Sequence, residues 1–205
     1  MVVVGSAVAV QHLRAADPIM ARIIDLVGPF NLRSQPSHFY ALLSSIVSQQ
    51  ISTKAAATIL GRVVALFPSA ADLTPLAVLA LGPEPLRIAG LSGMKARYVL
   101  DLSERVSDGR LDLSRLETLE DEAVIAELLP VKGIGRWTAE MFLIFSLGRL
   151  DVLPVDDLGL RLAVQRHYSF PELPQAAQIR TLATPWAPYR TVATWYLWRS
   201  LVTMP

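Results

Sequence analysis

Two adjacent carboxylates, Asp156 and Asp157, follow a glycine-bearing turn and an apolar stretch in this chain. The turn reads Lys132-Gly133-Ile134-Gly135. Glycine adopts positive φ angles and lets a ligand approach the backbone closely. Amides at the start of the next helix lie at its positive dipole end, where they suit an anion such as a nucleic-acid phosphate. These residues predict a hairpin that holds DNA and a carboxylate that acts on it.

Other catalytic chemistries lack the residues they need. The chain has no cysteine, which excludes disulfides, thiolate zinc sites and iron–sulfur clusters. The three histidines, His12, His38 and His167, lie far apart in sequence. This spacing argues against a histidine metal site and against a Ser-His-Asp triad.

The overall charge does not identify a partner. A net charge of +1 is too small to predict nucleic-acid binding by itself. The cations comprise three lysines and sixteen arginines (19 − 3). Arginine suits bidentate phosphate contacts, but the same bias can reflect genome base content, and both interpretations stay open.

Helical spacing, punctuated by proline and glycine, dominates the segments that must position these residues. Asp17, Ser37 and Ser52 or Thr53 are predicted N-caps. The chain has 205 residues, 52% of them hydrophobic, which is enough for one compact unit or two lobes. The sequence predicts an all-α fold of ten to twelve helices. The expected helices cover residues 18–28, 38–49, 54–67, a short one after 75, 85–89, 94–106, 119–129, 136–147, 157–168, 174–183 and 189–202.

The apolar N-terminal stretch MVVVGSAVAV has no basic segment before it and is too short to span a bilayer. No later run reaches 18 apolar residues. We therefore expect a cytoplasmic protein without a membrane partner, associated with the nucleoid if the source is bacterial.

The predicted helix 119–129, hairpin 130–135 and helix 136–147 together form a helix–hairpin–helix. The string LPxxGIGRWTA, followed by PVDDLGLR, resembles the helix–hairpin–helix DNA glycosylase superfamily and, within it, the 3-methyladenine DNA glycosylase II branch. The resemblance covers roughly residues 36 to 200. It extends to FYALLSSIVSQQIS at 39–52, GMKARY at 93–98 and WAPYR at 186–190.

The resemblance implies one glycosylase unit over residues 1–205, made of two helical lobes with a DNA-binding cleft between them. Lobe A covers about 36–148 and contains the hairpin motif at 119–147. Lobe B combines about 1–35 with 149–205. Residues 1–35 are too few for the additional N-terminal β-domain of some relatives.

The resemblance also implies a function: excision of alkylated bases from double-stranded DNA, the first step of base-excision repair. A base must leave the duplex before its glycosidic bond can be reached. Bond cleavage builds positive charge on the sugar. A carboxylate can stabilise this charge or orient a water molecule against C1′ of the sugar. The 20-residue spacing from Trp137 (157 − 137) assigns this role to Asp157. An alternative alignment selects Asp156. The aspartate that is not catalytic would cap the following helix, and such a cap is also the structural interpretation open for both.

Trp137 stands where relatives that also cut the sugar–phosphate chain carry a Schiff-base lysine. A monofunctional glycosylase is therefore expected. Trp137, Trp198 and Gln49 are the predicted base pocket, because aromatic faces attract a cationic base. Gln50 aligns with the wedge that fills the gap left by the flipped nucleotide, although some relatives carry an apolar residue there. For Trp195, core packing is the favoured interpretation.

The predicted phosphate contacts come from the hairpin and the start of the next helix: Lys132, Gly133, Gly135, Arg136 and Thr138. By resemblance, the backbone carbonyls of Leu129, Val131 and Ile134 hold a monovalent cation, Na⁺ or K⁺. No other cofactor is expected, and the protein is expected to be a monomer. Arg190 is either a phosphate contact, a partner near Asp157 or an ordinary surface residue.

Two rival functions remain open. One is a non-catalytic DNA-binding module that uses the hairpin only as a phosphate clamp, which would gain nothing from carboxylates that face DNA. The other is a glycosylase for oxidised bases, against which the tryptophan at position 137 argues.

Overall fold

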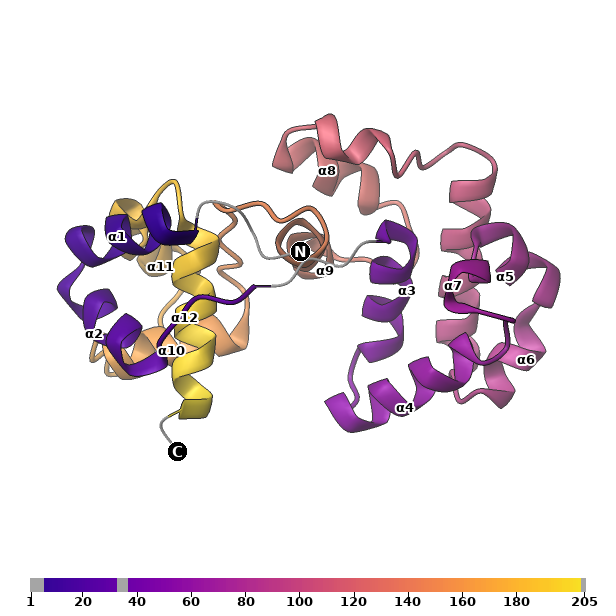
Figure 1. Ribbon diagram of the computed structural model, residues 1–205, viewed down its shortest axis with the longest axis horizontal. Coiled ribbons are helices and arrows are strands. Elements are labelled where there is room, and N and C mark those ends of the chain that lie inside the picture. Colours follow the sequence, from indigo (N-terminus) through magenta and orange to yellow (C-terminus); the bar gives the residue numbers. More distant parts are fainter. Residues whose placement is uncertain (1–5, 33–36, 204–205) are drawn as a thin grey trace. The chain divides into compact units, whose positions relative to one another are not determined.

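The computed structural model of the chain describes residues 6–32 and 37–203, and every regular element in them is a helix (Figure 1). The all-α prediction is therefore confirmed. The chain forms two compact units, one from Met1–Ser34 with Leu143–Pro205 and one from Gln35–Phe142. We call the first the terminal unit and the second the central unit. The division falls within one helix, whereas the sequence placed the lobe boundary at about residue 148, in the loop after it.

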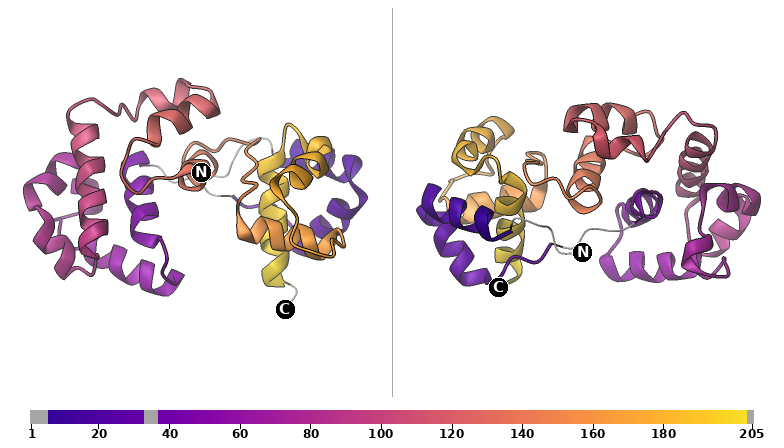
Figure 2. Two further views of the ribbon diagram at one scale, coloured as in Figure 1. Left: turned by 180° about the vertical axis from the view of Figure 1, so that it is seen from behind. Right: turned by 45° about the horizontal axis from the view of Figure 1, so that its top comes forward.

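The terminal unit joins segments from both ends of the sequence. Its last helix, α12, packs against α2 and α10, as the views in Figure 2 show. The first helix packs against the second and against α12. The helices of this unit are α1 (Ser6–Ala16), α2 (Pro18–Val27), α10 (Leu158–His167), α11 (Ala176–Leu182) and α12 (Arg190–Thr203).

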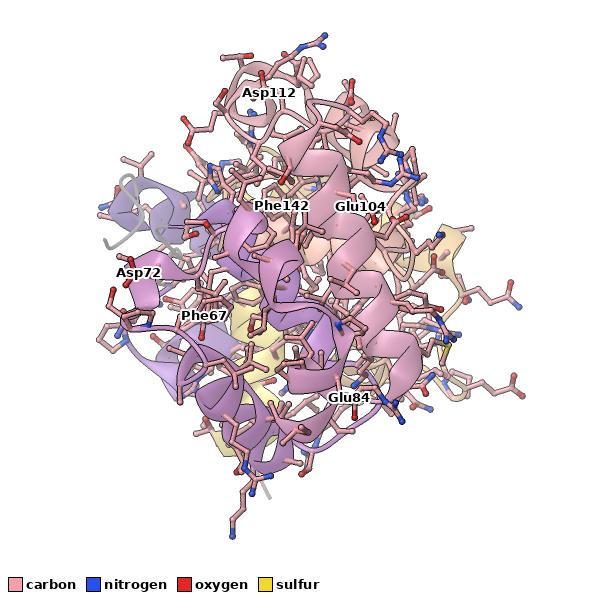
Figure 3. The ribbon with its side chains drawn as sticks, turned by 90° about the vertical axis from the view of Figure 1, so that its right-hand side faces the viewer. Phe67, Asp72, Glu84, Glu104, Asp112 and Phe142 are labelled. Atoms are coloured by element: carbon pink, nitrogen blue, oxygen red, sulfur yellow. The ribbon has the colours of Figure 1, made fainter. Side chains whose placement is uncertain are left out.

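The central unit is built around α7, the 15-residue helix Gly93–Ser107, which contacts α3, α5 and α6. Figure 3 looks onto α7, with Glu104 on this helix and Asp112 in the loop that follows. The other helices are α3 (His38–Ser48), α4 (Thr53–Val64), α5 (Pro75–Leu81), α6 (Pro83–Ile88), α8 (Asp121–Leu128) and α9 (Arg136–Phe145), of which α9 continues past the boundary at Phe142.

Side-chain caps start several helices where the sequence predicted them. Asp17, Ser37 and Ser52 each accept hydrogen bonds from backbone amides in the first turn of the helix that follows. Such caps satisfy amides that have no partner within the helix. The predicted starts at residues 18 and 38 are confirmed. The helix that Ser52 caps, α4, starts at Thr53, one residue before the predicted position.

Some helix starts and several short helices differ from the sequence prediction. Leu119 has an extended backbone, with ψ of 153°, so α8 begins only at Asp121. Three short 3₁₀ helices, Ala70–Asp72, Arg115–Thr118 and Thr184–Trp186, were not predicted. A single turn of helix leaves no hydrophobic periodicity that a sequence pattern could reveal.

Asp17 also holds the terminal unit together. One of its oxygens accepts the amides of Ile19 and Met20. The other accepts the Tyr168 hydroxyl at 2.6 Å and the Trp186 indole N–H at 2.9 Å. Asp17 is buried, and a buried carboxylate needs such donors. The bonds connect α2 to residues more than 150 positions later in the chain.

In the part of the chain that the structure describes, no helix is long and apolar enough to cross a membrane.

Candidate active site and nucleic-acid interface

The hairpin between α8 and α9 is tightly closed. The Val131 amide donates to the Leu128 carbonyl, and the Ile134 amide donates to the Val131 carbonyl, both at 3.0 Å. Gly133 has φ of +83°, a conformation that favours glycine. A Cβ atom at this position would lie 2.2 Å from Cδ2 of Tyr98. Gly133 is therefore required both by its backbone and by the ring packed against it.

The hairpin retains backbone donors for a ligand. Among the described residues, no acceptor is recorded for the backbone amides of Gly133 and Gly135, while the Lys132 amide donates to Oδ2 of Asp101 at 2.9 Å. The first amides of α9 likewise have no acceptor within the helix. Unpaired amides at a helix N-terminus form an anion site, as the sequence predicted for this turn.

Asp101 on α7 fixes the base of the hairpin. Besides the Lys132 amide, it accepts Nε of Arg105 at 3.0 Å, and its Oδ1 lies 3.4 Å from Nζ of Lys132. Burial raises the pKa of Asp101, but the hydrogen bonds and the positive charge of Arg105 outweigh it and hold the pKa below its ordinary value. Asp101 therefore stays ionised under the hairpin. The Lys132 side chain remains 67% exposed, so its ammonium can reach a phosphate.

The side chains of Arg136 and Thr138, two of the predicted phosphate contacts, have other surroundings in the structure. The Arg136 guanidinium pairs with both oxygens of Glu122 and also lies 3.3 Å from Glu140. Any phosphate contact of Arg136 must compete with these carboxylates. Thr138 is only 5% exposed, so its hydroxyl is not presented to a DNA backbone. The first turn of α9 places this hydroxyl in the core, and the predicted phosphate contact at Thr138 then depends on its backbone amide.

The two glutamines at the end of α3 take different positions. Gln49 is half-buried and its side-chain amide donates to the Gly133 carbonyl at 2.7 Å, so it contacts the hairpin. Gln50 is exposed and has φ of +56°. A non-glycine residue in this left-handed region costs on the order of 1–3 kcal/mol unless its surroundings enforce it.

Lys95 holds the backbone that leads into Gln50. Its ammonium donates to the carbonyls of Val47 at 2.6 Å and of Gln49 at 2.7 Å. Both carbonyls lie at the C-terminal end of α3, where intrahelical donors run out and a cation is favoured. Burial lowers the pKa of Lys95 from its ordinary value.

The terminal unit contains the candidate catalytic carboxylate. Oδ1 of Asp157 accepts the Leu160 amide at 2.7 Å and the Trp198 indole N–H at 2.7 Å. Asp157 is thus the N-cap of α10. The sequence analysis gave this cap to whichever aspartate is not catalytic, which would be Asp156 if Asp157 is catalytic. The cap at Asp157 agrees with the structural interpretation that the sequence allowed for either aspartate, and the expectation that Asp156 caps α10 when Asp157 is catalytic is wrong.

Small and flat side chains surround the Asp157–Trp198 pair. The Phe145 ring is stacked on the Trp198 ring, with 5.9 Å between centroids and 16° between planes. A Cβ on Gly159 would lie 3.1 Å from both Oδ1 of Asp157 and Cδ1 of Trp198. The glycine in the first turn of α10 therefore allows the indole to reach the carboxylate.

Asp156 and Arg190 differ from this arrangement. Asp156 is exposed, and no hydrogen bond to its side chain is recorded among the described residues. Arg190 forms a bidentate pair with Asp151, with both distances at 2.7 Å. This pair bridges the loop before α10 to the start of α12.

The other tryptophans occupy separate environments. Trp137 is the second residue of α9, in the central unit, and is 45% exposed. Trp195 packs edge-on against Phe30, with 4.9 Å between centroids, and so follows the core-packing interpretation. Trp186 is completely buried and donates its indole N–H to Asp17.

The predicted cation ligands are backbone carbonyls within the closed hairpin. Carbonyl oxygens suit a hard monovalent ion. The Val131 carbonyl already accepts the Ile134 amide, and a carbonyl oxygen has a second lone pair that remains for an ion. Within the described ranges, no group of three or more His, Cys, Asp or Glu side chains could hold a metal ion.

Residues 43–188 match the model of the HhH-GPD superfamily base excision DNA repair protein. The match includes both the hairpin and Asp157. The chain belongs to the HhH-GPD superfamily. A superfamily relative from Schizosaccharomyces pombe, DNA-3-methyladenine glycosylase 1, is 33% identical over 193 residues, which cover 92% of this chain and 85% of that protein.

Two solved structures of the HhH-GPD type share the fold. The DNA-3-methyladenine glycosidase of Bacillus halodurans has a TM-score of 0.83 at 42% identity, covering 93% of this chain and 87% of that one. The Schizosaccharomyces pombe 3-methyladenine DNA glycosylase Mag1, in complex with abasic DNA, also has a TM-score of 0.83, at 33% identity, covering 93% and 94%.

Several supporting residues of this HhH-GPD chain were missed by the sequence analysis: Lys95, Tyr98, Asp101, Phe145 and Gly159. For Gly159 a signal existed, because glycine in a helix is unfavourable and often marks a close approach. Asp101 and Tyr98 gave none, since their partners lie more than 30 positions later in the chain.

Proposed function

We propose that this protein is a monofunctional DNA glycosylase that excises alkylated bases from double-stranded DNA and thereby starts base-excision repair. The single observation that carries the proposal is the half-buried Asp157 carboxylate, held at 2.7 Å by the Trp198 indole, within a chain whose superfamily match spans it. The names of the relatives, which include DNA-3-methyladenine glycosylases, support the choice of alkylated bases.

The chemistry proposed for Asp157 is charge stabilisation. A purine alkylated at N3 or N7 is cationic and leaves readily, so little protonation by the enzyme is needed. Departure of the base builds positive charge at the sugar. A fixed carboxylate stabilises this charge or orients a water molecule that attacks the sugar. Two donors hold Oδ1 of Asp157, so its orientation is set before substrate binds. Preorganisation of this kind lowers the cost of reaching the transition state.

The central unit would hold the DNA. The amides of Gly133 and Gly135, together with the exposed ammonium of Lys132, are the proposed phosphate contacts. Carbonyls of Leu129, Val131 and Ile134 would hold a Na⁺ or K⁺ ion that bridges to a phosphate. Gln50 is the proposed wedge, and Trp137 and Trp198 are the proposed base-pocket aromatics. We expect the protein to act as a monomer on chromosomal DNA.

A lyase activity is not part of this proposal. Schiff-base chemistry needs a lysine, and position 137, where relatives with lyase activity carry one, is tryptophan. Lys132 is the lysine of the hairpin, and its ammonium lies beside Asp101.

The test is release of base from duplex DNA that carries methylated purines, with wild type, Asp157→Asn and Asp156→Asn compared. Wild type should release methylated base, Asp157→Asn should be inactive, and Asp156→Asn should retain activity. No release by wild type would reject the glycosylase. Loss of activity in Asp156→Asn alone would move the catalytic role to that residue.

The rival functions give different outcomes in the same assay. A non-catalytic clamp would bind the duplex and release nothing. A glycosylase for oxidised bases would act on duplex that contains 8-oxoguanine and spare the methylated one. Strand cleavage without added alkali would contradict the monofunctional assignment.

A further inference from the structure

The turn after α3 has a backbone that its own sequence does not favour. Gln50 has φ of +56° although it is neither glycine nor asparagine. Residues of this kind persist only where their surroundings enforce the conformation. Gln50 is also exposed, so its side chain is not what holds it. The restraint must act on the backbone around it.

Lys95 holds the peptide group that directly precedes Gln50. The Gln49 carbonyl and the Gln50 amide belong to one planar peptide group. The Lys95 ammonium lies 2.7 Å from that carbonyl and 2.6 Å from the Val47 carbonyl two residues earlier. Holding the carbonyl fixes this plane, which is one of the two ends from which the φ angle of Gln50 is measured.

The same turn is joined to the hairpin. The Gln49 side-chain amide donates to the Gly133 carbonyl at 2.7 Å. Gly133 in turn packs against Tyr98, which lies one helical turn after Lys95 on α7. Therefore α7 sets the position of both the Gln50 turn and the hairpin from residues three positions apart.

We propose that Lys95 is a positioning residue for the Gln50 wedge, holding the Gln49–Gln50 peptide so that Gln50 is presented to the gap in the duplex. This inference rests on the proposed function. Two of the three N–H donors of the ammonium are committed to carbonyls, so its role is structural support of the wedge and not phosphate binding. Gln50 contacts DNA, and Lys95 acts through Gln50.

The experiment measures binding to a duplex with a tetrahydrofuran abasic-site analogue and to an intact duplex of the same sequence. The ratio of the two affinities reports the wedge, because only the abasic duplex offers a gap. Lys95→Met removes the ammonium and keeps the length of the side chain. We expect it to lower the abasic preference about tenfold, the effect of losing hydrogen bonds to a charged group.

A double-mutant cycle with Gln50→Ala separates positioning from general stability. Where Gln50 is alanine, Lys95→Met should leave the abasic preference unchanged, because no wedge remains to be positioned. Lys54→Met is the matched control, since it removes the same charge from an exposed side chain. It should lower both affinities by the same factor.

An equal loss of preference from Lys95→Met in both Gln50 backgrounds would overturn the inference, as would an unchanged preference in the single variant or no preference in wild type. If Lys95→Met melts below the assay temperature, Lys95→Gln, which keeps two donors on a shorter chain, is measured across the same backgrounds with the same expectation. Failure of the glycosylase proposal is seen separately, as absence of base release by a wild type that prefers abasic duplex.

Discussion

The indole N–H of Trp198 donates to Oδ1 of Asp157 across 2.7 Å, although the residues lie 41 positions apart. The same oxygen caps α10, so the carboxylate is fixed from two sides. A group held in this way loses little conformational freedom when substrate binds. The pair converts a helix cap, which by itself has only a structural role, into a candidate catalytic group.

Trp198→Phe tests this relationship. Phenylalanine retains the ring face that stacks on Phe145 but lacks the N–H donor. We expect the single-turnover rate of base release to fall about tenfold to a hundredfold, the effect of losing a hydrogen bond to a charged group. Trp195→Phe, on the same helix, is the control and should retain the wild-type rate. Equal rates for Trp198→Phe and wild type would show that the indole donor is dispensable.

The two hairpin glycines should respond differently to alanine. Gly133→Ala places a methyl group 2.2 Å from the Tyr98 ring on a backbone with positive φ, and should lower stability by about 1–3 kcal/mol. A Cβ on Gly135 meets nothing within 4 Å, so Gly135→Ala should melt like wild type. Its methyl group would still hinder a phosphate and weaken DNA binding. Thermal denaturation and a binding titration separate the two effects, and equal melting temperatures would contradict the packing argument.

Lys132 should account for part of the salt dependence of DNA binding. Each neutralised phosphate contributes about one unit to the slope of log affinity against log salt concentration. Lys132→Met should therefore reduce this slope by about one. Arg14→Met, which removes a cation paired with Asp25 in the terminal unit, is the matched control and should leave the slope unchanged. A slope that is flat for wild type would argue against phosphate binding by the hairpin.

Asp17 should make the protein sensitive to acid. Burial raises the pKa of this carboxyl, but hydrogen bonds from Tyr168, Trp186 and the amides of Met20 and Ile19 outweigh it and lower the pKa below the ordinary value. A lowered native pKa contributes stability that is present above the unfolded pKa, about 4, and is lost as pH falls through the native pKa.

Asp17→Asn should lower the free energy of unfolding at pH 7 by about 2–3 kcal/mol, because charge-assisted bonds are lost. Its melting temperature should also change less than that of wild type between pH 5 and lower pH. Asp25→Asn, an exposed carboxylate paired with Arg14, is the control and should follow the wild-type profile. Parallel profiles for Asp17→Asn and wild type would remove Asp17 from the account of acid sensitivity.

Local sequence signals predicted the elements of this protein well. Asp17 before Pro18, Ser37 before the apolar stripe of α3 and the glycines of the hairpin all carry their physical reason within a few residues. Local helical spacing along the chain predicted the all-α class. The residues around Gly133 carried the resemblance to the superfamily.

Long-range pairing was not predictable in this way. The bonds from Gln49 to Gly133 and from Trp198 to Asp157 join residues 84 and 41 positions apart, and nothing local indicates which residues pair. Arg190 offered several partners by sequence, and only the folded chain selects Asp151. The burial of Thr138 was not predictable either, because the sequence does not tell which face of the first turn of α9 is buried.

The terminal unit is assembled from the two ends of the chain, with the continuous segment Gln35–Phe142 between them. A ribosome therefore releases α1 and α2 long before α12, the helix that packs on α2. Until α12 emerges, α2 with its apolar residues Met20, Ile23 and Ile24 lacks one of the helices that it packs against, while the central unit can already fold. Completion of this protein is thus timed by its last helix, and the nascent chain carries an exposed apolar helix through most of its synthesis.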